Sequence, residues 1–94
     1  MKFAYLIMGA EFCPRHDSAA IHGGDAQIIG VASVDEACEE AVRLKQEGID
    51  CIELCGAFGP EGAMRVVEAV QNSVPVGYAV HLPIQDELFG QVFG

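Results

Sequence analysis

Four short apolar runs predict four β-strands, at residues 2–8, 27–32, 50–55 and 74–80. Each run has the length and apolar content of a strand and is bounded by turn-forming residues. In the first run the residues of both parities are apolar, which is typical of a strand covered on both faces. Pro75 stands at the start of the last run, where a missing N–H donor does least harm.

The chain between the second and third strands has helical spacing. Ser33 and Glu36 match the capping box, in which each side chain satisfies a free backbone amide of the other. The helix that they open is expected to end at Gly48. Its apolar residues recur at the i, i+3, i+4 spacing of an amphipathic helix. They are Val34, Ala37, Cys38, Ala41 and Val42.

A second helix is predicted from Pro60 to about Asn72, because proline favours the first helical position. The tail at residues 83–93 also places apolar residues at helical spacing, but Gly90 weakens the pattern. We therefore expect a short C-terminal helix there.

These elements follow the order β-β-α-β-α-β and predict one α/β domain over residues 1–94, with a four-stranded, largely parallel sheet. If the third strand lies between the second and fourth, both main helices cover one face. The result resembles a fragment of a (β/α) barrel. The first strand has two open placements, parallel beside the third strand or antiparallel to the second.

Residues 10–26 show no sustained periodicity and predict a long loop, with one helical turn around residues 18–21 as an option. Ordered loops of this length are uncommon unless they are functional. The loop contains Cys13, His16, Asp17 and His22, which could ligate a transition metal. No second pair at zinc-finger spacing follows, so we predict an ordinary surface loop without a metal site, and metal binding is the alternative.

Strand parity separates two faces of the predicted sheet. The large apolar set suits packing under helices, whereas the opposite set is mostly small. The large set is Ile29, Val31, Ile52, Leu54, Val76, Tyr78 and Val80. The small set is Ile28, Gly30, Ala32, Cys51, Glu53, Cys55, Gly77, Ala79 and His81. This second face needs a cover, so we expect a homo-oligomer, a dimer or higher.

Glu53 is a carboxylate within an otherwise apolar strand, where burial of its charge is costly unless it is paired. Such a group can serve as a general base, or it can be a structural acid held by backbone amides or a second subunit. Cys55 and His81 end two neighbouring parallel strands, where α/β sheets place their ligands. Together the three residues predict a pocket. The predicted lid residues from the long loop are Arg15, His16 and His22.

The turn containing Gly56, Phe58 and Gly59 leads into the second helix. Free amides and the positive helix end at such a turn can hold a small anionic ligand. Glu61 in the first helical turn opposes an anion, and the turn matches no nucleotide-binding fingerprint. The alternative interpretation is that this segment is an ordinary tight turn without a ligand. No cofactor motif is present, and the cofactor remains unknown.

The charge balance limits the classes of partner that the protein is expected to bind. The 94 residues include 5 Lys and Arg against 14 Asp and Glu, a net charge of −9, and the cations are scattered. Nucleic acid and anionic membranes require clustered cations, so neither is expected. No apolar run could span a bilayer, and no secretory signal is recognisable. We expect a cytoplasmic protein whose four cysteines are reduced.

The segments at residues 52–59 and 75–78 resemble a family of small prokaryotic proteins of about a hundred residues, classed only as a domain of unknown function. The resemblance runs nearly end to end. It implies a compact α/β domain and brings no catalytic residue. Three functions remain: a small-molecule or anion binding module, which we favour; a lyase, isomerase or hydrolase using Glu53 as base with Cys55 or His81; and a structural protein without a site.

Overall fold

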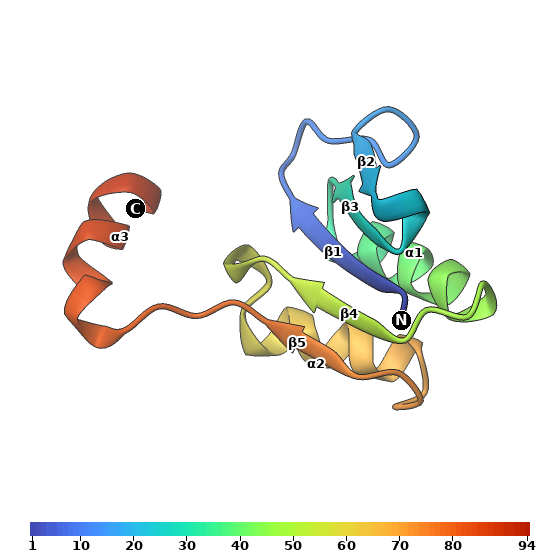
Figure 1. Cartoon of the computed structure of the whole chain (residues 1–94). Coiled ribbons are helices and arrows are strands. Elements are labelled where there is room, and N and C mark those ends of the chain that lie inside the picture. The colour runs from blue at the N-terminus through green and yellow to red at the C-terminus, as the bar shows by residue number, and fades with distance from the viewer.

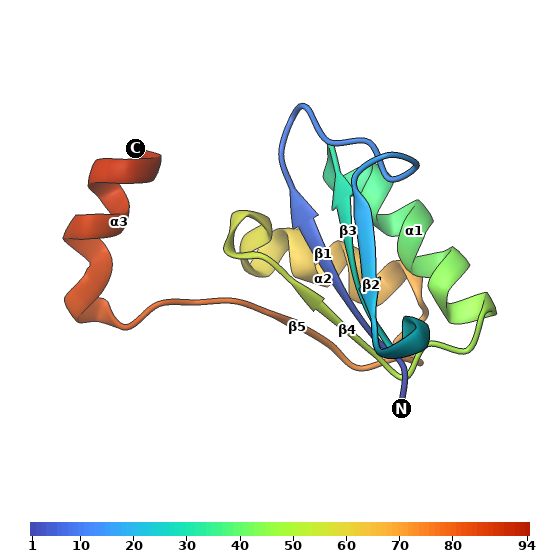
Figure 2. The ribbon, with the colours of Figure 1, turned by 45° about the horizontal axis from the view of Figure 1, so that its top comes forward.

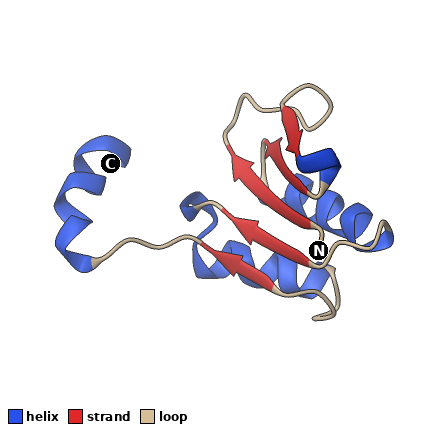
Figure 3. Ribbon diagram, in the orientation of Figure 1, coloured by secondary structure: helices blue, strands red, loops and turns tan.

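The computed structural model describes residues 1–94 and contains a five-stranded, mostly parallel sheet (Figures 1 and 3). The strand order is β2-β3-β1-β4-β5, with β2 antiparallel to β3 and all other pairs parallel. The strands are β1 (Phe3–Met8), β2 (Ser18–Ile21), β3 (Ala26–Val31), β4 (Cys51–Leu54) and β5 (Val76–Tyr78).

Three α-helices and three 3₁₀ turns complete the chain. Helices α1 and α2 lie on the same face of the sheet, as predicted, and contact each other (Figure 1). No helix is both long enough and apolar enough to cross a membrane. The helices are α1 (Val34–Gln46), α2 (Gly59–Ala69) and α3 (Asp86–Phe93). The 3₁₀ turns are η1 (His22–Gly24), η2 (Gly56–Phe58) and η3 (Pro83–Gln85).

The predicted start of α1 is confirmed. The Ser33 hydroxyl accepts the Glu36 N–H, while the Glu36 carboxylate accepts the Ala32 N–H at 2.8 Å. Gly48 adopts φ 86° just after the helix, the left-handed conformation that glycine supplies at helix ends. Helix α2 ends at Ala69, before the predicted end at Asn72, because the chain turns into the left-handed region there.

The prediction of four strands is wrong, because residues 18–21 form β2 rather than a loop or helical turn. This strand pairs antiparallel with β3 from Ser18↔Ile29 to Ile21↔Ala26. Positive φ angles at His22, Gly23 and Gly24 reverse the chain between the two strands. Strand formation here depends on pairing with β3, which the local sequence does not reveal.

The strand at residues 3–8, whose placement the sequence leaves open, occupies the centre of the sheet as β1. It pairs parallel with β3 on one side and β4 on the other. One of the two open placements, parallel beside residues 50–55, is therefore correct. The apolar residues of β1 at both parities predict a strand covered on both faces, whereas helices cover only one face here.

The hydrophobic core lies between the sheet and helices α1 and α2. It consists of Ala4, Leu6, Ile29, Val31, Ala37, Ala41, Leu44, Ile49, Ile52, Leu54, Phe58, Ala63, Val66, Val70 and Val74. The predicted burial of residues 29, 31, 52 and 54 is confirmed, and Val76 packs at the margin. Tyr78, the last residue of β5, is instead 37% exposed, and Val80 lies beyond the strand and is 78% exposed.

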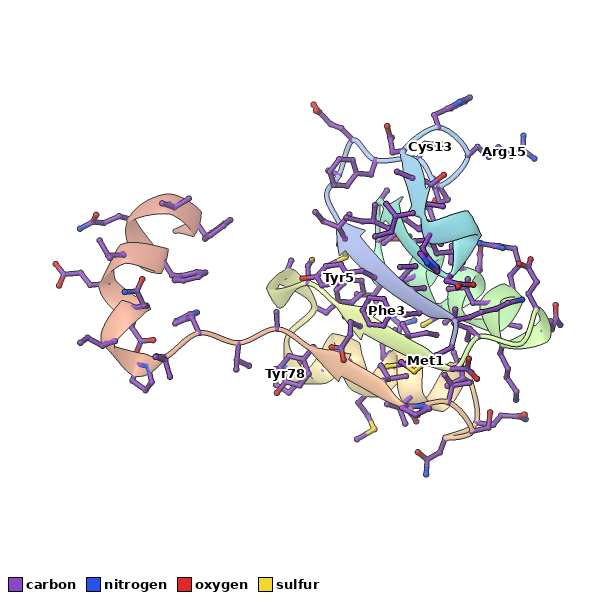
Figure 4. All side chains as sticks on the ribbon, in the orientation of Figure 1. Met1, Phe3, Tyr5, Cys13, Arg15 and Tyr78 are labelled. Atoms are coloured by element: carbon purple, nitrogen blue, oxygen red, sulfur yellow. The ribbon has the colours of Figure 1, made fainter.

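The other face of the sheet carries no helix (Figures 1 and 2). We call it the open face, and Figure 4 shows Phe3 and Tyr5 standing on it. By strand register its members are Phe3, Tyr5, Ile7, Ala19, Ile21, Ala26, Ile28, Gly30, Cys51, Glu53 and Gly77. Phe12 packs over Gly30, where an added Cβ would lie 2.9 Å from the phenylalanine ring. Ile28 is 42% exposed, and Phe3, Tyr5 and Ile7 beside it are half-buried.

The last sixteen residues, 79–94, project away from the remainder of the chain, which we call the body (Figures 1 and 2). We call this segment the C-terminal arm. Every residue in it is exposed, and η3 is the one element that α3 contacts extensively. The predicted C-terminal helix is thus confirmed, but it does not cover the body.

Candidate functional site

A cleft of about 1060 Å³ lies at the carboxyl ends of β1, β4 and β5, between the body and the arm. Met8, Cys55 and Tyr78 line its body side, whereas Phe89 and Phe93 line its arm side. Most of the lining is apolar, and no lysine or arginine contributes to it. Such a surface suits an apolar molecule that is oriented by a few polar groups.

Cys55 stands where β4 ends and is tied to the central strand. Its backbone N–H donates to the Leu6 carbonyl at 3.0 Å, and its Sγ accepts the Met8 N–H at 3.3 Å. These bonds hold the thiol at the carboxyl edge of the sheet, partly buried against the core and beside the cleft. The sequence correctly placed Cys55 at this edge.

The turn after Cys55 contributes backbone rather than a large side chain. Gly56 and Gly59 line the cleft, and Gly59 adopts φ 62° where the chain enters α2. A Cβ on Gly56 would approach the Ala79 carbonyl oxygen to 3.3 Å, so the turn lies close to the start of the arm. Phe58 points elsewhere, since its side chain is buried in the core.

His81 lies at the root of the arm. Its Nε2 is 2.7 Å from the Asp86 carboxylate, and its ring stacks on Phe89 at 3.9 Å between centroids. Phe89 in turn stacks on Phe93 at 5.7 Å. His81 and Cys55 line the same cleft, but no hydrogen bond joins them. A pair acting as base and nucleophile is recognised by such a bond, which this structure lacks.

Glu53 lies on the open face rather than in the wall of the cleft. It stands between Tyr5 and Gly77 in register, and an added Cβ on Gly77 would come within 2.7 Å of its carboxylate. Glycine at position 77 therefore makes room for the acid, as the parity argument predicts. Burial and then the Glu53 charge raise the pKa of the Cys51 thiol on the same strand.

The structure does not bring the predicted lid residues to the cleft. Arg15 and His16 lie in a turn closed by the His16 N–H donating to Cys13, and Figure 4 places Arg15 far from Tyr78. His22 lies between β2 and β3, where its Nδ1 is 3.1 Å from the Asp25 carboxylate. No group of three or more His, Cys, Asp or Glu side chains could hold a metal ion.

Sequence reasoning missed the aromatic residues that line the cleft. Tyr78 was assigned to the helix-covered face, and Phe89 and Phe93 received no role. The available signal was the i, i+4 spacing of two phenylalanines in a short terminal helix, which gives one aromatic stripe. That signal does not reveal which surface the stripe faces.

The four cysteines are free, and their environments predict an order of reaction. Cys55 borders the open cleft, whereas Cys38 packs against the core, where burial raises the pKa of its thiol. We expect a maleimide at neutral pH to modify Cys55 before Cys38, because the thiolate is the reactive form. Peptide mass mapping over time measures both rates. Equal rates would contradict the assigned packing of Cys38.

Comparisons with known proteins give one match. Neither the curated proteins nor the solved structures contain a match to this chain. The family model described as "Family of unknown function (DUF6506)" matches residues 1–94. The expected resemblance to a small domain of unknown function is thereby confirmed, and the chain belongs to this family.

Proposed function

We propose that the protein is a homo-oligomeric module that binds a small, largely apolar molecule in the cleft at the carboxyl edge of the sheet. The cleft itself carries the proposal. Its volume of about 1060 Å³ reaches the upper range of small-molecule sites, roughly 300–1,000 Å³. Its position, outside the carboxyl ends of parallel strands, is where α/β sheets bind their ligands.

The lining favours a particular ligand chemistry. Phe89 and Phe93 offer aromatic surface, and Tyr78 and His81 offer groups able to orient a polar substituent. Asp86 also lines the cleft, where it is bonded to His81, and no lysine or arginine contributes to the lining. An uncharged or weakly polar ligand fits this lining best. We propose a cytoplasmic location, consistent with free thiols, and no nucleic-acid partner, consistent with the net charge of −9.

Two uncovered surfaces support the homo-oligomer. The open face leaves Ile28 exposed, and the arm exposes seven large apolar side chains. These seven are Val80, Leu82, Ile84, Leu88, Phe89, Val92 and Phe93. Monomeric proteins rarely expose contiguous apolar patches beyond a few hundred Å². A second copy would remove both surfaces from water.

A small anion is a second candidate ligand, because Gly56 and Gly59 bring backbone to the cleft beside the start of α2. Glu61 in the first turn of that helix opposes it. The enzyme alternative has less support, since Glu53 lies outside the cleft wall and His81 is bonded to Asp86. A structural protein without a site would leave the cleft unexplained.

The binding proposal is tested by filling the cleft. Ala57 lines the cleft and is exposed, so Ala57→Trp should fill space without disturbing the core. We expect this change to weaken binding of Nile red, a neutral apolar probe, by roughly tenfold or more, as for about 1.4 kcal/mol of lost contact. Fluorescence titration measures the affinity, with Ala20→Trp on exposed β2 as the matched control.

Equal Nile red affinity in the Ala57→Trp and Ala20→Trp variants would contradict the proposed site. The ligand class is decided by two further titrations. Anilinonaphthalene sulfonate adds a negative charge to an apolar body, and inorganic phosphate supplies the charge alone. Competition by phosphate would favour the anion candidate, whereas tighter binding of the neutral probe would favour the apolar ligand.

A further inference from the structure

We infer that α3 of each chain packs against the open face of a second copy, so that two copies exchange their arms. This inference rests on the proposed homo-oligomer and deepens it. It names the surfaces that meet, and it makes the cleft dependent on the partner. The two surfaces are the outer side of α3 and the sheet face opposite α1 and α2.

The arm presents two distinct apolar stripes. Phe89 and Phe93 line the cleft of their own chain. Ile84, Leu88 and Val92 follow each other at i, i+4 spacing and do not line it. Side chains at this spacing share one side of a helix. The three are 83%, 54% and 74% exposed, so the outer stripe has no partner within its own chain.

The arm is internally organised and is not a loose tail. His81 is joined to Asp86 and stacked on Phe89, and the Gln85 N–H donates to the Leu82 carbonyl. These contacts fix the angle between the extended root of the arm and α3. An exposed helix held in this way is suited to dock on a surface beyond its own body.

The open face is suited to receive that helix. Parallel sheets are normally covered on both faces, and here α1 and α2 cover only one. Phe3, Tyr5 and Ile7 lie in line along the central strand, with Ile28 beside them on β3. A helix laid across these residues would complete the missing third layer.

The charges of the two surfaces favour a second copy over other occupants. The arm bears Asp86 and Glu87 and no lysine or arginine, and Glu53 is the one charged residue of the open face. Nucleic acid or an anionic lipid surface would find no cation on either surface. Apolar contact is the common property of both, and one chain carries both members of the pair.

Twofold symmetry increases the apolar surface that the dimer can bury. Every contact occurs twice in such a dimer, so the outer stripes of both arms, each with Ile84, Leu88 and Val92, would contribute. The partner would then hold α3 in place, and α3 is one wall of the cleft. The proposed site is therefore complete only in the dimer.

The test uses two full-length variants that fail in different ways. Leu88→Glu with Val92→Glu disables the arm, and Ile28→Glu disables the face. Alone, each loses both docked contacts of the dimer, so we expect self-association to weaken by roughly 100-fold. Mixed together, the two variants retain one intact arm-to-face contact. Sedimentation of the mixture should then show a heterodimer of intermediate affinity.

Three outcomes would overturn the exchange: a wild-type chain that is monomeric at high concentration, an arm variant that associates as tightly as wild type, or a mixture that does not associate. Circular dichroism must show that each variant is folded, with Ile28→Gln as the replacement if Ile28→Glu is not. An arm variant that still forms tight oligomers leaves the homo-oligomer intact and removes only the exchange. The Ala57→Trp titration decides the cleft separately.

The salt dependence of self-association independently tests whether a second copy occupies the open face. Two copies of net charge −9 repel each other, so raising the salt to roughly 0.5 M should strengthen an apolar dimer by screening that repulsion. Docking that depends on attraction to a cationic partner would weaken instead. Weaker self-association at high salt would contradict the apolar exchange.

Discussion

Replacing Leu6 with alanine is expected to lower the free energy of unfolding by about 3–5 kcal/mol. Leu6 is fully buried on the central strand, directly between Ile29 of β3 and Leu54 of β4, which are also buried. Neighbours on both sides cannot easily collapse into the cavity, so most of the lost contact remains lost. A domain of this size is stable by roughly 5–15 kcal/mol, so the change removes a large share.

Urea unfolding followed by circular dichroism measures this loss. Ile21→Ala is the matched control, because Ile21 is 70% exposed on the edge strand β2. Its cost should lie within about 0.5 kcal/mol of zero, as for most surface substitutions. Similar losses in the two variants would show that the helix-covered side of β1 is not the core of the folded protein.

The elements that the sequence predicted well depend on local signals. The Ser33 cap and Gly48 mark the ends of α1 through contacts within a few residues. Strand parity correctly separated Ile52 and Leu54 from Glu53, because alternation is a property of the strand itself. The capping residues and the strand alternation are therefore readable without knowing how the remainder of the chain folds.

The elements that were missed depend on pairing between distant residues. Strand β2 has the sequence Ser-Ala-Ala-Ile, which carries no strand pattern and becomes a strand only against β3. The central place of β1 depends on its pairing with both β3 and β4. Because its residues of both parities are apolar, its own sequence does not indicate which strands lie beside it. Such choices are decided by the assembled sheet, which the local pattern does not encode.

Some residues of the candidate site were likewise predictable from local signals, and others were not. Cys55 and the glycine turn were placed correctly at the carboxyl edge, because strand direction determines which end of a strand they occupy. Glu53 shares the parity of Cys55 but lies on the open face within β4. The cleft forms beyond the ends of the strands, so Glu53 does not line it. The role of Phe89 follows from the path of the arm, and that path is not a property of strand parity.

Deleting residues 83–94 is expected to leave the body folded while it abolishes both self-association and tight binding of Nile red. No residue of the hydrophobic core lies beyond Val74, so the deleted segment supplies none of the packing between the sheet and its two helices. It does supply Phe89 and Phe93, which form one wall of the cleft. We expect affinity for the probe to fall by at least roughly tenfold.

Three measurements separate the possible results. Urea unfolding should give a midpoint close to that of wild type at low protein concentration, where association contributes little stability. Sedimentation should show a monomer, and fluorescence titration should show weak binding. A full-length Met64→Glu variant is the control, because it removes an exposed apolar side chain of α2, outside both the cleft and the open face. If the truncated chain unfolds, the arm contributes to the stability of its own body, and a packed position of α3 within one chain replaces the exchange between two.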